Sequence, residues 1–230
     1  MGNYIIIGGS SGIGLTLANT LSEKDHEVHV YSRTKSDELN SSVIHHECDV
    51  LKDEITTDLN EVNGLVYCPG SINLKPFQSL SENDFSQDFN INVLGAVKSV
   101  KAFLRPLKKT EGASIVFYST VAVGQGMPFH SSVAASKGAI EGFTKSLAAE
   151  LAPKVRVNCV APSITDTPLA AKLLSNDEKK EKSGERHPLK RVGSPEDIAA
   201  ITSFLLSSEA SWITGQIIGV DGGMSTLKPL

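Results

Sequence analysis

The stretch Tyr4-Ile5-Ile6-Ile7-Gly8-Gly9-Ser10-Ser11-Gly12-Ile13-Gly14 decides the fold. A short β-branched run enters a glycine-rich turn, and a segment with helical periodicity follows at once. Glycines in such a turn let a pyrophosphate approach the backbone amides. The helix start then supplies free N–H groups and the positive end of a dipole. The order strand, glycine turn, helix therefore predicts a dinucleotide-binding site, and a purely structural turn is the alternative.

Apolar strand-like runs and helical segments alternate along the rest of the chain. Several of these runs are apolar almost throughout, as parallel strands buried on both faces should be. The alternation predicts an α/β fold, a single Rossmann-type doubly wound parallel sheet of about seven strands with helices on both faces, over residues 1–230. We expect strands at 4–7, 28–31, 43–46, 65–67, 114–118, 155–160 and 216–220, and helices at 13–24, 54–60, 82–109, 134–151 and 195–206.

The composition excludes several classes of function. Apolar residues make up 40% and charged residues 21% of 230 residues, which argues against disorder. The net charge of −4 leaves no electrostatic footprint for nucleic acid, and no apolar run is long enough for a membrane span. Cys48, Cys68 and Cys159 lack metal-ligand spacing, so we expect reduced thiols in a cytoplasmic protein and no metal. A small-molecule substrate is the partner that remains.

The residues after the second expected strand bear on the choice of cofactor. An acid at this point would accept a hydrogen bond from the ribose 2′-hydroxyl of NAD. This chain has Ser32-Arg33-Thr34 and no acid before Asp37. A guanidinium offers a planar fork of donors that suits a phosphate. Arg33 therefore favours NADP (NADPH), and a solvated arginine at a strand end is the alternative.

On these residues the chain resembles the short-chain dehydrogenase/reductase family. Gly8, Gly12 and Gly14 match its glycine motif, and Cys48-Asp49-Val50 is similar to the segment whose aspartate contacts adenine. The likeness runs the length of the chain and includes Asn92, Thr167 and the stretches 155–162, 187–197, 213–216 and 220–223. The resemblance implies a Rossmann fold, a nicotinamide dinucleotide, hydride transfer and a homodimer or homotetramer.

The same resemblance implies a set of cofactor-binding residues. One stretch departs from the family pattern, because Tyr67-Cys68-Pro69-Gly70 stands where Asn-Asn-Ala-Gly is usual. The predicted cofactor-binding residues are Gly8, Ser10, Ser11, Gly12, Ile13, Gly14, Ser32, Arg33, Thr34, Asp49, Val50, Cys68, Pro69, Gly70, Lys137, Pro162, Thr165 and Thr167.

A second departure concerns catalysis. The family motif is a tyrosine, three residues and a lysine, and here Lys137 is present but Val133 stands at the tyrosine position. Thr120 replaces the family serine and keeps a hydroxyl that can hold a carbonyl. Asn92 matches the asparagine that holds a proton-relay water. Val133 cannot donate a proton, so cofactor binding is predicted more firmly than ketone reduction.

His130 is the best candidate for a replacement proton donor. It lies seven residues before Lys137, on the same helical face as Val133 if the helix extends backward. The family's enoyl reductases place their tyrosine at this seven-residue offset, and an imidazole ordinarily titrates near pH ~6.5. The alternative is a loop histidine without a catalytic role. Ser131, Ser132 and Tyr118 are weaker candidates.

Two functions follow from these observations. The first is an NADP(H)-dependent oxidoreductase that transfers hydride to a small carbonyl or conjugated enone, with Asn92, Thr120, Lys137 and His130 as catalytic residues. The second is a catalytically lapsed NADPH-binding module that acts as a sensor or a partner subunit, and Val133 motivates it. The region 163–191, most polar over 175–191, is expected to form a substrate lid, with an exposed surface helix as the alternative.

Overall fold

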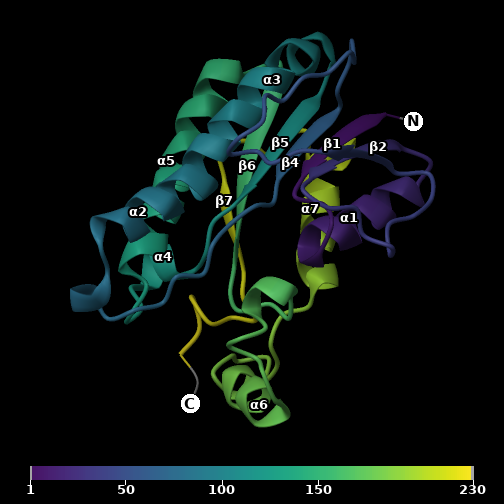
Figure 1. Cartoon of the computed structure of the whole chain (residues 1–230). Helices are drawn as coiled ribbons and strands as arrows, with labels where there is room; N and C mark the ends of the chain where they lie inside the picture. The colour runs from purple at the N-terminus through teal and green to yellow at the C-terminus, as the bar shows by residue number, and fades with distance from the viewer. Residues whose placement is uncertain (1, 229–230) are drawn as a thin grey trace.

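The protein is one seven-stranded parallel sheet with helices on both faces, as predicted (Figure 1). A computed structural model describes residues 2–228. The strand order is β3-β2-β1-β4-β5-β6-β7, so the chain reverses its direction of winding between β1 and β4. The strands are β1 (Asn3–Ile7), β2 (Glu27–Ser32), β3 (Ile44–Glu47), β4 (Gly64–Tyr67), β5 (Ala113–Tyr118), β6 (Val155–Pro162) and β7 (Ile217–Val220).

Two hydrophobic clusters hold the helices to the sheet. One face packs against α3 and α5 through residues such as Phe103 and Ile140, and the other packs against α1 and α7 through Leu17 and Ile198. All six residues of β5 are buried, which is why its sequence is apolar nearly throughout. The helices are α1 (Gly12–Ser22), α2 (Glu82–Phe89), α3 (Gly95–Lys109), α4 (Ala122–Gln125), α5 (Ser131–Leu151), α6 (Asp177–Glu185) and α7 (Pro195–Leu206), with single 3₁₀ turns η1 (Phe77–Ser79), η3 (Pro168–Ala170) and η4 (Ser208–Ala210).

The helix expected at 54–60 was wrong. The structure has an irregular segment between β3 and β4, in which Ile55 is buried against the α3 side of the sheet. Two adjacent threonines, Thr56 and Thr57, lose rotamer freedom in a helix, and so short a segment gains little from helix formation. The burial of Ile55 in an irregular segment therefore stabilises this region more than a short helix would.

The long helix expected at 82–109 contains a π-helical turn. The turn η2 (Asn90–Leu94) joins α2 to α3 and carries Asn92, which is 1% exposed. Turns of this kind are rare and gather at functional sites. It places Asn92 under the carboxyl end of the sheet.

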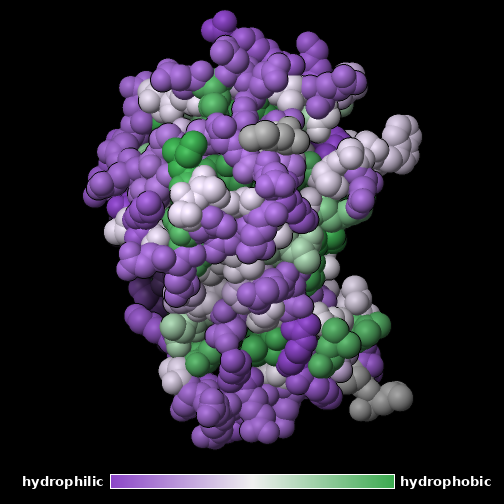
Figure 2. All heavy atoms as spheres, turned by 90° about the vertical axis from the view of Figure 1, so that its right-hand side faces the viewer, coloured by the Kyte–Doolittle hydropathy of each residue, from purple (hydrophilic) through white to green (hydrophobic). Residues whose placement is uncertain are grey.

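The chain between β6 and α7 forms a lobe below the sheet, with α6 at its lower end (Figure 1). Figure 2 shows the surface hollowed between this lobe and the body that contains the sheet. Most residues of α6 are exposed. Within residues 2–228, no helix combines the length and apolar character that a bilayer crossing requires.

Candidate functional site

A crevice of about 680 Å³ opens at the carboxyl ends of the strands. Its walls come from the ends of β1, β2, β4, β5 and β6, from α5 and from the lobe. It lies where the strand order reverses between β1 and β4, the place where open α/β sheets bind ligands. The topology therefore gathers loops that are distant in sequence around one cavity.

The glycine turn forms one end of the crevice. Gly8 (φ +79°) and Gly12 (φ +52°) have the left-handed backbone that favours glycine. Ser11 precedes α1 but makes no side-chain capping bond, so amides at the start of this helix face the crevice without a capping partner. A Cβ on Gly14 would lie 2.5 Å from the carbonyl oxygen of Gly8. The helix can start this close to the strand only because position 14 is glycine.

Arg33 and Asp49 lie at the crevice wall beyond β2. Arg33 is exposed, and its charge contributes to lowering the pKa of Asp49, for which a hydrogen bond from the Leu51 backbone is the largest cause. Ser32, another predicted cofactor residue, lines the crevice but is 6% exposed. Its hydroxyl donates to the Thr34 carbonyl (2.9 Å) and contacts His45 Nε2 (3.0 Å). The guanidinium is therefore the more accessible group at this wall.

The segment Cys68-Pro69-Gly70, which differs from the family pattern, forms the middle of the crevice. Burial raises the pKa of the Cys68 thiol to about 12, so the thiol is neutral at physiological pH. A Cβ on Gly70 would lie 3.3 Å from both Asn92 Oδ1 and Lys137 Nζ. Gly70 therefore leaves the space through which these two polar atoms approach the crevice.

Lys137 comes from α5 and defines the opposite end of the crevice. Its Nζ donates to the Tyr118 carbonyl (2.9 Å), and burial lowers the pKa of the amine to about 8. Thr120 lies on the same wall, and its Oγ1 accepts from the Ala122 amide (3.3 Å). An ammonium and a hydroxyl therefore converge at this end.

Asn92 lies behind this wall and not in it. Its Nδ2 donates to Ser136 Oγ (2.9 Å) and Ser71 Oγ (3.1 Å). Its Oδ1 is buried and has no hydrogen-bond partner among the described residues. A buried acceptor without a partner is costly, and a polar group arriving beside Gly70 would satisfy it.

His130 and Val133 also line the crevice beside Lys137. His130 is the N-cap of α5, so the three residues share the helix face that the sequence predicts. The ring nitrogen Nδ1 of His130 lies 2.7 Å from the Pro128 carbonyl, and Nε2 makes no hydrogen bond in the described part of the chain. Val133 is 5% exposed and presents only methyl groups.

The weaker donor candidates are turned elsewhere. The phenol of Tyr118 contacts Thr202 Oγ1 of α7 (2.9 Å) on the other face of the sheet, and burial raises its pKa well above 10. Ser132 donates to Asp88, and Ser131 is exposed and outside the crevice lining. The structure therefore leaves His130 and Lys137 as the protonatable side chains at the Val133 position.

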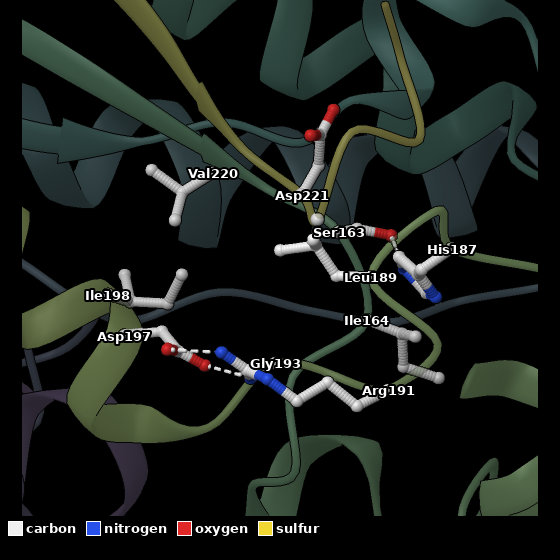
Figure 3. A pocket seen from close by; sticks show the side chains of 11 residues that line it. Ser163, Ile164, His187, Leu189, Arg191, Gly193, Asp197, Ile198, Val220 and Asp221 are labelled. Carbon is white, nitrogen blue, oxygen red and sulfur yellow. Dashed lines mark hydrogen bonds and ion pairs between the residues drawn. The ribbon is translucent and has the colours of Figure 1, made fainter. Parts of the chain in front are cut away.

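The lobe closes the crevice from below. Pro162, Thr165 and Thr167 line the crevice together with apolar side chains of the lobe. His187 ties the lobe to the end of β6, with its Nε2 2.8 Å from Ser163 Oγ (Figure 3). Its Nδ1 lies 2.8 Å from the Ser183 carbonyl oxygen.

A smaller pocket of about 170 Å³ adjoins the crevice behind His187. There Arg191 and Asp197 form a bidentate ion pair (2.5 and 2.8 Å), which fixes the end of the lobe to the first turn of α7 (Figure 3). The His187–Ser163 hydrogen bond and the Arg191–Asp197 ion pair anchor the lobe to the rest of the protein. Apolar side chains of the lobe line the crevice.

All eighteen predicted cofactor residues line this one crevice, and so do three of the four predicted catalytic residues. Asn92 is the exception, because it lies behind Gly70. Sequence reasoning missed Ser71 and Asp88, which bond to each other beside Asn92; the helical spacing of four residues between Asp88 and Asn92 was the available signal. No group of three or more His, Cys, Asp or Glu side chains within residues 2–228 is arranged to hold a metal.

The fold and the crevice define a Rossmann-type α/β protein with its ligand site at the topological switch point. The family model for enoyl-(acyl carrier protein) reductase matches residues 8–225. The 3-oxoacyl-(acyl-carrier-protein) reductase FabG of Chlamydia trachomatis is 33% identical over 241 residues, covering 96% of each chain. The chain belongs to the short-chain dehydrogenase/reductase family.

Solved structures agree with this assignment. The ligand-free aldohexose dehydrogenase of Thermoplasma acidophilum is similar with a TM-score of 0.90 and 31% identity, covering 100% of this chain and 96% of that one. ElxO with NADP bound is similar with a TM-score of 0.88 and 27% identity, covering 99% and 100%.

Proposed function

We propose that this protein is an NADP(H)-dependent reductase of a small carbonyl or conjugated enone, with a proton donor other than tyrosine. The observation that carries the proposal is that the two ends of one crevice carry different and complementary chemical groups. One end offers uncapped amides of α1 and the exposed guanidinium of Arg33. The other end offers the Thr120 hydroxyl and the Lys137 amine. This is the distribution of groups that a dinucleotide and a carbonyl substrate require together.

The chain's own residues fit NADPH along the crevice. The α1 amides and the glycine turn would hold the pyrophosphate, because Gly14 lets the helix start close to the strand. Arg33 would hold the 2′-phosphate, and Lys137 the nicotinamide ribose. The buried Asn92 Oδ1 beside Gly70 lacks a partner in the described residues, which also suits a polar ligand at this point. ElxO, a structural relative, has NADP bound.

The reaction needs a hydride and a proton. When bound, the dihydronicotinamide supplies the hydride. The Thr120 hydroxyl would hold the substrate oxygen, and Val133 stands where the family has its proton-donating tyrosine. The imidazolium form of His130 would donate the proton from Nε2 and become the neutral ring, because its Nδ1–H donates to the Pro128 carbonyl and its Nε2 makes no hydrogen bond in the described residues.

A second function has Val133 in its favour. A methyl surface at the tyrosine position is compatible with a protein that binds NADPH and turns nothing over. Such a module would serve as a sensor or a partner subunit. The two functions share the same cofactor site and differ only in turnover.

Binding and turnover are measured separately to distinguish them. NADPH binding by fluorescence titration tests the cofactor site, and NADPH consumption against quinones, diketones and enals tests the reductase. We expect binding in the micromolar range or tighter and turnover with at least one compound class. Tight binding with no turnover across the panel would support the module, and absence of binding would contradict both functions.

Two variants test the proton donor. His130→Ala should lower turnover about a hundredfold or more, the lower end of the range for losing general acid catalysis, and leave NADPH affinity unchanged. His26→Ala, beyond the end of α1 and outside the crevice lining, is the matched control. Unchanged turnover in the His130 variant removes it from the mechanism. Val133→Tyr should create or raise ketone reduction, because the phenol would then stand one turn from Lys137.

We also propose a cytoplasmic homodimer or homotetramer. One side of α5 carries small residues that suit close packing of two helices: Ala135 and Gly142 are exposed, and Gly138 and Ala139 are partly buried. Light scattering on the purified chain measures the number of subunits.

A further inference from the structure

A buried carboxylate lies behind the crevice and has no place in the proposed reaction. Asp88 is on α2 and is 2% exposed. Its Oδ1 accepts from Ser71 Oγ (2.6 Å), and its Oδ2 accepts from Ser132 Oγ (2.5 Å) on α5. Ser71 lines the crevice, so its hydroxyl lies between this carboxylate and the cavity.

Asp88 makes no ion pair with any cation in the described part of the chain; its partners are two neutral hydroxyls. An ionised carboxylate removed from water costs several kcal/mol unless other groups compensate it. Lys137 is in the complementary situation: it is 8% exposed, and its Nζ bonds one backbone carbonyl. Two opposite charges are therefore buried near each other without a direct contact.

A short hydrogen-bonded chain leads from the carboxylate toward the lysine. Ser71 donates to Asp88, and Asn92 Nδ2 donates to Ser71 Oγ (3.1 Å). Asn92 Oδ1 and Lys137 Nζ both lie 3.3 Å from the point where a Cβ on Gly70 would be. The path from Asp88 to Lys137 therefore runs through polar atoms on the inner side of the crevice wall.

The two thiols that face Lys137 carry no charge at neutral pH. Burial is the largest influence on the lysine and lowers its pKa, while Cys159 of β6, Cys68 after β4 and Asp88 of α2 act in the opposite direction. Burial raises the pKa of both thiols to about 12, so they are neutral near pH 8. Glu141, one turn further along α5, accepts from Ser119 Oγ (2.6 Å). Asp88 is thus the anion among these groups that acts on the lysine.

We propose that Asp88 is a positioning residue of the crevice: its carboxylate is the buried counter-charge of the Lys137 ammonium and orients the Ser71 hydroxyl at the crevice wall. The carboxylate accepts the hydrogen bond that the Ser71 hydroxyl donates, and Asn92 donates to one Ser71 lone pair, so the remaining lone pair of Ser71 Oγ is available to the cavity. Without tyrosine at position 133, the lysine has no neighbouring phenol to share its charge. A fixed anion beneath the wall keeps the amine protonated at the pH at which it would hold the cofactor.

The inference rests on the proposed function for the role of Lys137, but its test needs no turnover. Titration of the Lys137 Cε signal by NMR, in protein carrying ¹³C-labelled lysine, gives the pKa of this amine directly. Lys137→Arg identifies the signal. In Asp88→Asn we expect the pKa of Lys137 to fall by about half a unit or more, since an opposite charge nearby favours the charged form. Glu82→Gln removes a charge from the exposed side of the same helix and should leave the value unchanged.

A second readout concerns the cofactor. The pH at which NADPH affinity falls should move down in Asp88→Asn by the same amount as the Lys137 titration, while Glu82→Gln follows the wild type. Equal Lys137 pKa values in the Asp88 variant and the wild type would overturn the inference even if the variant were less stable. A shifted pKa in a protein without reductase activity would uphold it and contradict only the reaction.

A combined variant covers loss of folding in Asp88→Asn. Asp88→Val with Ser71→Ala and Ser132→Ala removes the charge together with both hydroxyls that would be left without an acceptor. Replacing a buried polar group and its partners by apolar groups is often neutral for stability. The Lys137 pKa should fall in this variant too, and an unchanged value there would refute the inference equally.

Discussion

Replacing Arg33 by alanine should weaken NADPH binding and leave NADH binding nearly unchanged. Arg33 lines the crevice at the carboxyl end of β2 and is exposed. Its side chain makes no hydrogen bond or ion pair at bonding distance within residues 2–228, and Asp49 is the anion whose pKa it affects. The guanidinium is therefore free to bind a phosphate without first breaking an internal contact.

The expected magnitude follows from that availability. A charge-assisted bond from a guanidinium to a phosphate is stronger than a neutral one, and no competing internal bond offsets it. We expect the Kd for NADPH to rise about tenfold to a hundredfold, which corresponds to ~1.4–2.8 kcal/mol. Because the site is exposed, salt screens the interaction, and the loss should be larger at 50 mM than at 500 mM salt.

Calorimetric titration of the wild type and the variant with NADPH and with NADH measures this difference. Lys35→Ala is the matched control, because it removes a positive charge two residues away that lies outside the crevice lining. Equal losses for the two cofactors in Arg33→Ala would refute the reasoning, since they would show that the guanidinium does not read the phosphate. An equal loss in Lys35→Ala would attribute the effect to net charge alone.

Three further predictions concern packing and ionisation. Gly14→Ala should abolish NADPH binding and lower stability by about 1–3 kcal/mol, because its Cβ would lie 2.5 Å from the Gly8 carbonyl; thermal unfolding and titration measure both effects. Arg191 lowers the pKa of Asp197 to about 2, so the ion pair should stabilise the fold above pH 4 and cease to do so as the pH falls toward 2. Asp197→Asn should remove that acid dependence in urea unfolding. Burial lowers the pKa of Lys137 from 10.5 to about 8. Between pH 8 and pH 10.5 the unfolded chain therefore binds this proton while the folded protein has lost it, so the unfolding free energy rises with pH. Relative to Lys137→Met, the unfolding free energy of the wild type should rise by up to about 3 kcal/mol over that range. A flat difference between the two proteins across that range would contradict the last prediction.

The sequence predicted the sheet because strands buried on both faces are apolar throughout. Runs such as Ile5–Ile7 and Ile115–Phe117 cannot face water, and helical periods separate them, so parallel winding follows. The irregular segment between β3 and β4 escaped prediction. Its local pattern is compatible with a helix, and only the depth at which Ile55 packs against the sheet decides its extended course.

The residues of the site show the same division between features that the sequence predicts and features that tertiary packing decides. The glycine turn, Arg33, Thr120 and Lys137 could be selected from sequence and line one crevice, because each is defined by its residue type at a fixed distance from a strand or helix end. The hydrogen bonds of Asp88 to Ser71 and to Ser132 could not, because they join residues that are 17 and 44 positions apart in the chain. The four-residue spacing of Asp88 and Asn92 indicates a shared helix face, but the hydrogen-bond partners on other segments depend on how the helices pack and leave no periodic signal.

By itself, then, the sequence determined the winding of the chain and which glycine turn opens the first helix at the crevice, because local conformation and burial pattern fix both. The tertiary structure alone decided which charges are buried together. Packing α2 against α5 places the carboxylate of Asp88 beneath the wall that carries Lys137, and the energy of a charge in a protein depends on its neighbours in space rather than on its neighbours in the chain.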